Sequence, residues 1–238
     1  MLRTSEQKEL MTGRLCIVTI VSFSGIDGAG KSTQIFEFES WLRRSGLRTK
    51  LVTFWDDVVA WSRFREVVSH KVLRGDKGIG SPEKPLNRRD KNITAWPLTV
   101  MRLFLYLADA VSLRLRVRRA RTRNTDVVIF DRYIYDELAN LPLGNRLVRV
   151  FVWLVLRVIP TPDVAYVIDA DPIAAWARKP EYPLEFVHRN REAYLALTRL
   201  AGGITIIEPG PIAITQSRVR QKMLREIWTG TSTLAMTR

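Results

Sequence analysis

The chain has 238 residues, one cysteine, and 38 lysine and arginine residues against 24 acidic residues, which gives a net charge of +14. A chain of this length can bury a large core without disulfide bonds. Its single cysteine, Cys16, excludes an intrachain bridge and favours the reducing cytoplasm. The positive charge favours anionic partners such as nucleotides, nucleic acids or anionic lipids.

The sequence contains no segment that we expect to cross a membrane. The first seventeen residues lack the apolar stretch of a signal peptide. The most apolar window, residues 147–159, is too short to span a bilayer and contains Arg149 and Arg157. We expect this window to form a mostly buried helix, with an amphipathic helix on a membrane surface as the alternative.

A phosphate-binding motif follows the first predicted strand, residues 18–23. Residues 25–32 fit the pattern G-x-x-x-x-G-K-S, and the stretch after them, to about residue 44, lacks glycine and proline and can form a helix. The glycines let backbone N–H groups turn toward an anion at the positive end of that helix. Lys31 can reach the outer phosphates, and the Ser32 hydroxyl can bind Mg²⁺.

Strand-like and helical stretches alternate along the rest of the chain. Further strands are expected at residues 49–54, 126–131, 164–169 and 204–207. Helices are expected at residues 58–73, 96–123, 133–159 (with a break near residues 142–144), 186–200 and 218–228. This alternation predicts an α/β fold, a three-layer α/β/α sandwich with a five-stranded parallel sheet, in one domain over residues 1–238. Residues 74–92 have the composition of a flexible insertion.

The predicted helix at 96–123 has two distinct parts. Its first part has an apolar face at helical spacing: Val100, Leu103, Phe104, Leu107, Ala108 and Val111. Its second part carries six arginines within ten residues: Arg114, Arg116, Arg118, Arg119, Arg121 and Arg123. This run indicates either a solvated helix end or a polyanion-binding surface, and it lacks the interleaved aromatics that would stack on nucleic-acid bases.

Two of the predicted strands end in aspartate. In the strand at 126–131 a wholly apolar run, residues 127–130, precedes Asp131, and the strand at 164–169 ends in Asp169. Ligands of open α/β sheets bind at the carboxyl ends of the strands. Since a phosphate loop is present, Asp131 is expected to hold Mg²⁺, usually through water, or to position a substrate; a turn or helix-cap role is the alternative.

These motifs together resemble the thymidylate kinase family of phosphate-loop nucleoside monophosphate kinases, over about residues 16–228. The resemblance rests on S-G-I-D-G-A-G-K-S-T-Q at 24–34, D-R-Y at 131–133, I-D-A-D-P at 168–172 and F-V-H-R-N-R-E-A-Y-L at 186–195. It implies transfer of the ATP γ-phosphoryl group to thymidine monophosphate with Mg²⁺. It also implies a five-stranded parallel sheet and a possible homodimer formed through apolar helices, for which 147–159 is a candidate.

The resemblance implies a role for each matching residue. On the ATP side, Lys31 and the loop amides hold the phosphates, while Ser32 and Asp131 serve the metal. On the acceptor side, Asp27 faces the sugar and Arg132 clamps the acceptor phosphate. Arg178 belongs to a short lid at about 172–185, and Tyr106 either stacks on the base or belongs to the core. The expected nucleotide-binding residues are Gly25, Asp27, Gly28, Ala29, Gly30, Lys31, Ser32, Thr33 and Tyr106.

The acceptor half departs from the family pattern. Ser24 replaces the usual glutamate before the loop, and Ala110 replaces the arginine that reads the thymine edge. Residues 55–57 are Trp-Asp-Asp where the family has an arginine, and the Ser-Ser and Tyr-Gln pattern after D-R-Y is replaced by Asp136, Glu137, Asn140 and Leu141. These departures leave open a kinase for another nucleotide, nucleoside or phosphorylated small molecule. The basic run at 114–123 leaves open a nucleotide-binding regulatory or nucleic-acid-associated protein with weak kinase activity.

Overall fold

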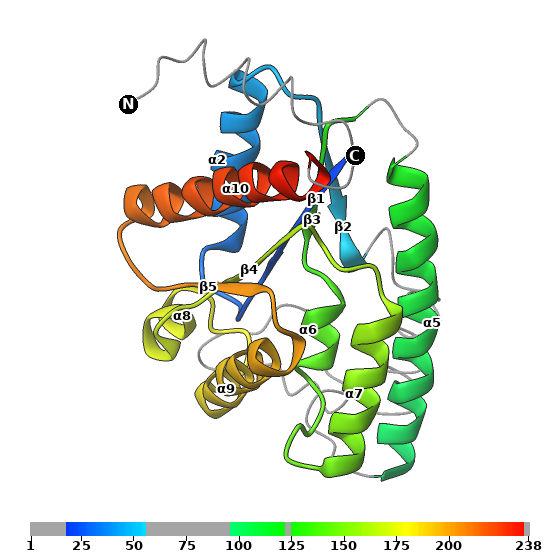
Figure 1. The fold of residues 1–238 in the computed structure, drawn as a ribbon. Helices are drawn as coiled ribbons and strands as arrows, with labels where there is room; N and C mark the ends of the chain where they lie inside the picture. The colour runs from blue at the N-terminus through cyan, green and yellow to red at the C-terminus, as the bar shows by residue number, and fades with distance from the viewer. Residues whose placement is uncertain (1–17, 56–95, 122–124, 236–238) are drawn as a thin grey trace.

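A computed structural model describes residues 18–55, 96–121 and 125–235 of the chain (Figure 1). Cys16, the helix expected at 58–73, the insertion expected at 74–92 and the acidic pair at residues 56–57 lie outside the described residues.

The five predicted strands form one parallel sheet. They are β1 (Thr19–Ser24), β2 (Thr49–Thr53), β3 (Val127–Asp131), β4 (Val164–Ile168) and β5 (Ile204–Ile207). The order is β2-β3-β1-β4-β5, and every pair is parallel. All residues of β1 and β4 are buried because both strands lie inside the sheet and are covered on both faces. The predicted strand count and direction are confirmed.

Helices cover both faces of this sheet, which confirms the three-layer sandwich. They are α2 (Lys31–Arg44), α5 (Trp96–Arg121), α6 (Ile134–Leu138), α7 (Arg146–Val158), α8 (Pro172–Arg178), α9 (Leu184–Ala201) and α10 (Ile212–Ala235). Helices α2 and α10 lie together on one side, and α5, α6, α7 and α9 lie on the other (Figure 1). The rings of Phe23, Phe38 and Tyr166 make edge-to-face and tilted contacts that join β1, α2 and β4.

Three helix boundaries differ from the sequence prediction. The break expected in 133–159 is wider, because α6 ends at Leu138 and α7 starts only after Asn145, whose side chain accepts the Leu147 N–H at 2.9 Å. The segment 172–185 contains a helix, α8, which Asp171 caps by accepting the Ala174 N–H at 2.8 Å. The last helix begins at residue 212 rather than 218.

The apolar face that helical spacing identifies on the long helix α5 is not the face that is buried. Phe104, Leu107 and Val111 are 71%, 44% and 52% exposed. The buried side chains instead follow a neighbouring stripe that comprises Tyr106, Ala110, Leu113, Val117 and Ala120. Helical spacing identifies an apolar face, but α5 is apolar on two sides and only its tertiary neighbours decide which one is buried.

The prediction that residues 147–159 form a mostly buried helix is wrong. Within α7 only Val148, Val152 and Val155 are buried, while Leu147 is 80% exposed. The described part of the chain contains no helix with both the length and the apolar character needed to cross a membrane.

Candidate active site

The glycines of the phosphate loop have backbone conformations that side chains disfavour. Gly25, Gly28 and Gly30 have φ angles of 139°, 81° and 88°. A Cβ atom at Gly25 would overlap the carbonyl oxygen of Ile168 at the end of β4, and one at Gly28 would overlap the carbonyl oxygen of Ala175 in α8. A Cβ at Gly30 would meet nothing within 4 Å. The loop is therefore packed tightly against β4 and α8 and is open beside Gly30, at the start of α2.

Lys31 is buried inside this loop. Its Nζ donates hydrogen bonds to the carbonyl oxygens of Gly25 and Ile26, each at 2.8 Å, and lies 3.9 Å from an oxygen of Asp27. Burial, followed by the nearby Arg132 guanidinium, lowers the pKa of Lys31 to about 8. A bound phosphate would favour the charged ammonium again, so this lysine is suited to hold an anion.

The start of α2 presents two hydroxyl side chains beside the phosphate loop. Ser32 and Thr33 are exposed in the first turn, next to backbone N–H groups that carry the positive end of the helix dipole. Ala29 is buried beneath them, and its N–H donates to the Ile26 carbonyl at 3.2 Å. The described residues contain no group of three or more His, Cys, Asp or Glu side chains arranged to hold a metal. Mg²⁺ at Ser32 and Asp131 would take its remaining ligands from phosphates and water, as it usually does.

Arg132 joins the end of β3 to the phosphate loop. Its backbone has a positive φ of 68°, and its N–H donates to the Phe23 carbonyl of β1 at 2.9 Å. Its guanidinium donates to an oxygen of Asp27 at 2.5 Å and lies 3.5 Å from an oxygen of Asp136. Burial on its own would lower the pKa of Arg132, but the carboxylates of Asp136 and Asp27 raise it above the usual range. The arginine therefore stays charged and is held over the loop.

Asp131 lies beside this arginine at the carboxyl end of β3. It pairs with Phe23 of β1 and with Thr53 of β2, so its carboxyl group lies at the edge of the sheet where the loop begins. Burial raises the pKa of Asp131 most strongly, against the opposing influence of Arg132 and Lys31. A cation near the carboxyl would therefore favour its ionised form.

Acids outnumber bases in this cluster. Asp27, Asp131 and Asp136 supply three carboxylates, whereas Lys31 and Arg132 supply two cations. A polyphosphate would add further negative charge to the same space. A further positive charge, from a divalent cation or from other parts of the chain, would therefore favour the binding of a polyphosphate here.

The structure does not bring every predicted site residue to this cluster. Arg178 is exposed at the end of α8, and its Nε donates to the Ala174 carbonyl of the same helix at 3.0 Å. Tyr106 is only 8% exposed and packs in the hydrophobic core, which favours the core role among its two predicted roles. Ala110 is fully buried on the same face of α5.

Sequence reasoning missed the buried group behind Arg132. Asp136 accepts hydrogen bonds from the hydroxyls of Ser24 and Tyr194, residues that are 112 and 58 positions away in the sequence. Ser24 and Asp136 both depart from the family pattern, but nothing in the sequence shows that they are in contact. The sequence also does not reveal the bidentate ion pair beside β4, in which Arg191 of α9 donates two hydrogen bonds to Asp169, each at 2.6 Å.

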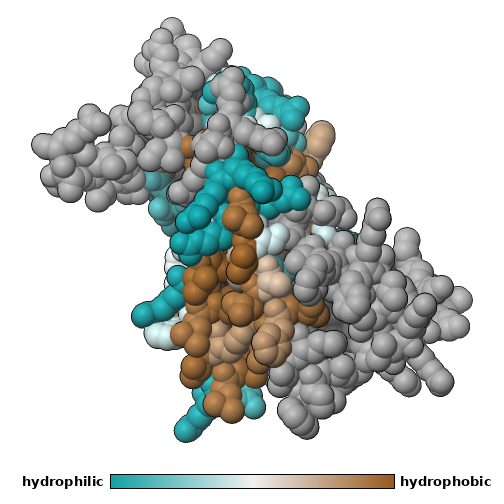
Figure 2. Space-filling view, turned by 90° about the vertical axis from the view of Figure 1, so that its right-hand side faces the viewer, coloured by the Kyte–Doolittle hydropathy of each residue, from teal (hydrophilic) through white to brown (hydrophobic). Residues whose placement is uncertain are grey.

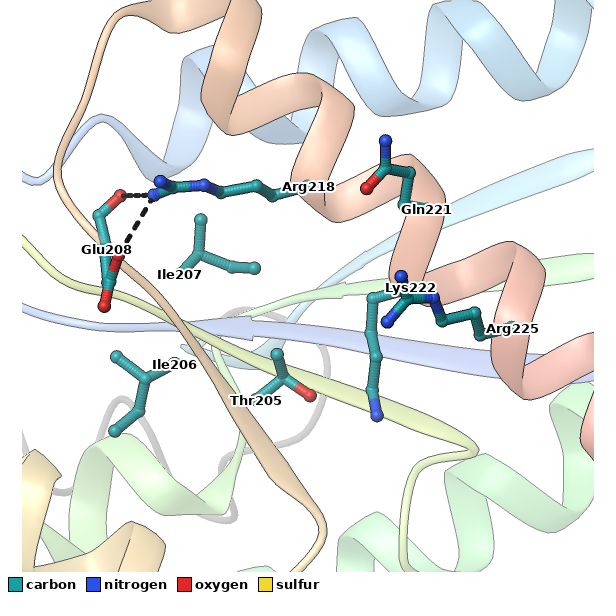
Figure 3. A pocket seen from close by; sticks show the side chains of 8 residues that line it. All are labelled: Thr205, Ile206, Ile207, Glu208, Arg218, Gln221, Lys222 and Arg225. Atoms are coloured by element: carbon teal, nitrogen blue, oxygen red, sulfur yellow. Dashed lines mark hydrogen bonds and ion pairs between the residues drawn. The ribbon is translucent and has the colours of Figure 1, made fainter. Parts of the chain in front are cut away.

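A pocket of about 240 Å³ lies elsewhere, between β5 and α10 (Figure 3). Thr205, Arg218, Lys222 and Arg225 contribute to its lining, and Arg218 is paired with Glu208 at 3.5 Å. None of the predicted phosphate-binding residues lines it. We therefore assign the active site to the loop and the strand ends, where the glycines, Lys31 and Arg132 meet, and not to this pocket.

The fold and this cluster together define a phosphate-loop nucleotide kinase. A parallel sheet carries a G-x-x-x-x-G-K-S loop after its first strand, and an Asp-Arg pair after β3 meets that loop. No protein-family model matches the chain. Individual proteins do match along most of its length.

The probable thymidylate kinase of Methanosphaera stadtmanae is 22% identical over 210 residues, which cover 86% of this chain and 97% of the relative. That of Pyrobaculum aerophilum is 29% identical over 195 residues, which cover 75% of this chain and 82% of the relative. The solved thymidylate kinase from Ehrlichia chaffeensis shares the fold, with a TM-score of 0.53 and 18% identity, over 87% of this chain and 98% of that protein. The chain is therefore similar over most of its length to proteins named as thymidylate kinases, and it shares their fold.

Proposed function

We propose that the protein transfers the γ-phosphoryl group of ATP to thymidine monophosphate, producing thymidine diphosphate and ADP. The observation that carries this proposal is the meeting of Arg132 with Asp27 and Lys31 at the phosphate loop. An arginine that follows a central strand and lies over a phosphate loop is suited to grip an acceptor phosphate beside the donor. The relatives that match most of the chain are named as probable thymidylate kinases.

On the ATP side, the loop amides and Lys31 hold the β- and γ-phosphates. Ser32 supplies a hydroxyl, and Asp131 a carboxylate, for Mg²⁺. When bound, Mg²⁺ neutralises phosphate charge. This role fits the excess of carboxylates in the cluster, because the two described cations do not balance even the local acids. Binding the triphosphate would also raise the pKa of Lys31 and so favour its charged form.

On the acceptor side, Arg132 binds the acceptor phosphate and Asp27 orients both this arginine and the sugar. Phosphoryl transfer depends mainly on positioning two anions in line and on neutralising their charge. Arg178 contributes a further positive charge when its side chain turns from the Ala174 carbonyl toward the loop. Tyr106 remains a candidate for contact with the base.

A coupled assay of ADP release tests this proposal. The panel includes thymidine monophosphate, the other nucleoside monophosphates and the unphosphorylated nucleosides, each with ATP and Mg²⁺. We expect turnover of thymidine monophosphate, its loss in Lys31→Ala, and no change in Lys222→Ala, whose ammonium pairs with Glu226 on α10. Turnover of a different acceptor without any turnover of a nucleoside monophosphate would overturn the proposal.

We further propose that the protein is a cytoplasmic homodimer. The exposed apolar side chains of α5 and α7 form two stripes with the same helical spacing: Phe104, Leu107, Val111 and Leu115 on α5, and Leu147, Val150, Leu154 and Val158 on α7. Figure 2 displays them as one apolar area. Eight such side chains, each at least 44% exposed, offer an area of the order of the ~800 Å² that each partner contributes to a standard interface. A second copy of the chain is the partner that fits this face in a family of soluble kinases.

A further inference from the structure

Asp136 is an unusual group to find at the base of a kinase site, because it is a carboxylate with almost no contact with water. Its side chain is 2% exposed, and it lies in the first turn of the short helix α6, directly after the D-R-Y motif. A buried carboxylate is strongly destabilising unless donors surround it. The donors around Asp136 come from three separate parts of the chain.

The two oxygens of this carboxylate have different partners. Oδ2 accepts hydrogen bonds from the Ser24 hydroxyl at 2.6 Å and from the Tyr133 N–H at 3.1 Å. Oδ1 accepts one from the Tyr194 hydroxyl at 2.8 Å and faces a guanidinium nitrogen of Arg132 at 3.5 Å. One oxygen is therefore fixed to the end of β1 and the start of α6, and the other is turned toward the arginine.

The hydroxyl of Tyr194, on α9, stays protonated and can therefore always donate a hydrogen bond. Burial raises the pKa of Tyr194 well above its usual value, and the neighbouring Asp136 carboxylate raises it further. The tyrosine hydroxyl therefore stays protonated and donates a hydrogen bond to Oδ1. The hydroxyl of Ser24 is likewise fully buried, so neither hydrogen bond competes with solvent.

Arg132 needs such support because its own backbone does not favour its position. A φ of 68° places a residue with a side chain in the left-handed region, where the strain is tolerated only if the surroundings fix the residue. The guanidinium is held on one side by Asp27 of the loop, which is a predicted substrate contact. Asp136 holds the opposite side from within the core.

We propose that Asp136 is a positioning residue, whose buried carboxylate fixes the guanidinium of Arg132 over the phosphate loop. This inference rests on the proposed function, because it gives Arg132 the acceptor phosphate as its ligand. A purely structural role is the competing explanation, since Asp136 also accepts the N–H at the start of α6. An uncharged side chain could serve that helix start equally well, whereas only a carboxylate also attracts the guanidinium.

Asp136→Asn separates these explanations, because asparagine retains an oxygen for the helix start and removes the charge. In the assay with thymidine monophosphate, we expect kcat/KM to fall by about tenfold to a hundredfold, mainly through kcat. In an Arg132→Lys background the same change should alter kcat/KM by less than about twofold, because the group that it positions is gone. Ser24→Ala and Tyr194→Phe should each give a smaller fall of the same kind, and they replace Asp136→Asn if that variant does not fold.

Asp126→Asn is the matched control, because Asp126 also pairs with an arginine, Arg48, but at the opposite end of β3. We expect it to leave kcat/KM unchanged. Equal effects of Asp136→Asn in the wild-type and Arg132→Lys backgrounds would overturn the positioning role.

A nuclear magnetic resonance measurement keeps the inference testable apart from turnover. A guanidinium held on two sides rotates slowly, so we expect separate Nη signals for Arg132, assigned by their loss in Arg132→Lys. These signals should merge in Asp136→Asn and persist in Asp126→Asn. If the wild type fails to phosphorylate any nucleoside monophosphate, the proposed function fails while this measurement still decides the Asp136 contact. Unchanged Arg132 signals in Asp136→Asn would refute the contact itself.

Discussion

At the scale of single residues, the surroundings of Lys31 in the phosphate loop disfavour its charged form, and a bound anion can offset this effect. The ammonium of Lys31 is buried and donates to two loop carbonyls, and it has the Arg132 guanidinium nearby. These surroundings favour the neutral amine, whereas bound phosphates favour the ammonium. Proton binding and nucleotide binding are therefore coupled at this residue.

We predict that ATP binding takes up a proton at about pH 8.5. With a pKa of about 8 in the free protein, Lys31 is largely neutral at that pH. Phosphate contact raises this pKa, so the amine gains a proton on binding, whereas at pH 6.5 it already carries one. Calorimetry in two buffers with different ionisation enthalpies measures the uptake, and Lys31→Met should abolish it. A binding enthalpy that is independent of buffer at pH 8.5 would contradict the prediction.

Gly28 has a role that its motif only partly explains. In addition to turning N–H groups toward phosphate, it lets the carbonyl oxygen of Ala175 in α8 approach the loop. We predict that Gly28→Ala destabilises the protein by about 1–3 kcal/mol, since it combines backbone strain with a steric overlap. Gly203→Ala is the control, because Gly203 also has a positive φ, of 66°, but has no atom within 4 Å of the added carbon.

Urea unfolding of both variants measures this difference, and binding of a non-hydrolysable ATP analogue reports on the loop. We expect Gly28→Ala to lose more stability than Gly203→Ala and to lose analogue binding, which Gly203→Ala should keep. Equal losses of stability would mean that the close contact between the loop and α8 does not contribute to the free energy of unfolding.

At the scale of secondary-structure elements, the strands could be predicted closely and the helix faces could not. Each strand lies within one residue of its predicted bounds because a run of β-branched residues between turns is a local signal. The buried face of α5 depends on which neighbours it meets, and Phe104 and Tyr106 are equally acceptable core residues until the fold is formed. The start of α8 had a local signal, Asp171 followed by Pro172, which fits a helix N-terminus.

In the candidate site, too, some features could be predicted from the sequence and others could not. Lys31, Asp131 and Arg132 could be assigned because contiguous motifs carry them, each with a fixed place relative to a strand. The contact of Ser24 with Asp136 and Tyr194 could not be predicted, because it depends on how three distant segments pack together. Polar contacts between distant segments have no periodicity that a single sequence reveals.

The helix α8, in the segment expected to form a lid, provides a prediction at this scale. We expect Arg178→Ala to lower kcat by about a hundredfold or more, because an arginine that stabilises the transferring group is worth 10³–10⁵ in rate in related reactions. The KM for ATP should change little, because Arg178 lies outside the loop cluster. Lys179→Ala is the neighbouring control, since its ammonium pairs with Glu181 at 3.2 Å. A kcat within about twofold of the wild type for Arg178→Ala would remove this residue from the mechanism.

At the scale of the whole molecule, the protein combines an exposed apolar face with a large positive charge. The stripes on α5 and α7 are bordered by exposed arginines, including Arg114, Arg116 and Arg149. A monomer rarely leaves an apolar patch of more than a few hundred Å² open to water. Two copies that share this face would cover it, but they would also bring two chains of charge +14 together.

We therefore predict a dimer that tightens as salt is added, because salt screens the repulsion between the arginine borders while the apolar contact remains. Sedimentation at several salt concentrations measures this, and Leu107→Glu should give a monomer. Phe36→Glu is the control, because Phe36 is 66% exposed on α2, outside the face. Binding of the same face to anionic vesicles would show the opposite salt dependence, since it would draw on attraction to lipid phosphates. A wild-type monomer at all salt concentrations, with vesicle binding that Leu107→Glu abolishes and salt weakens, would assign the face to a membrane surface instead.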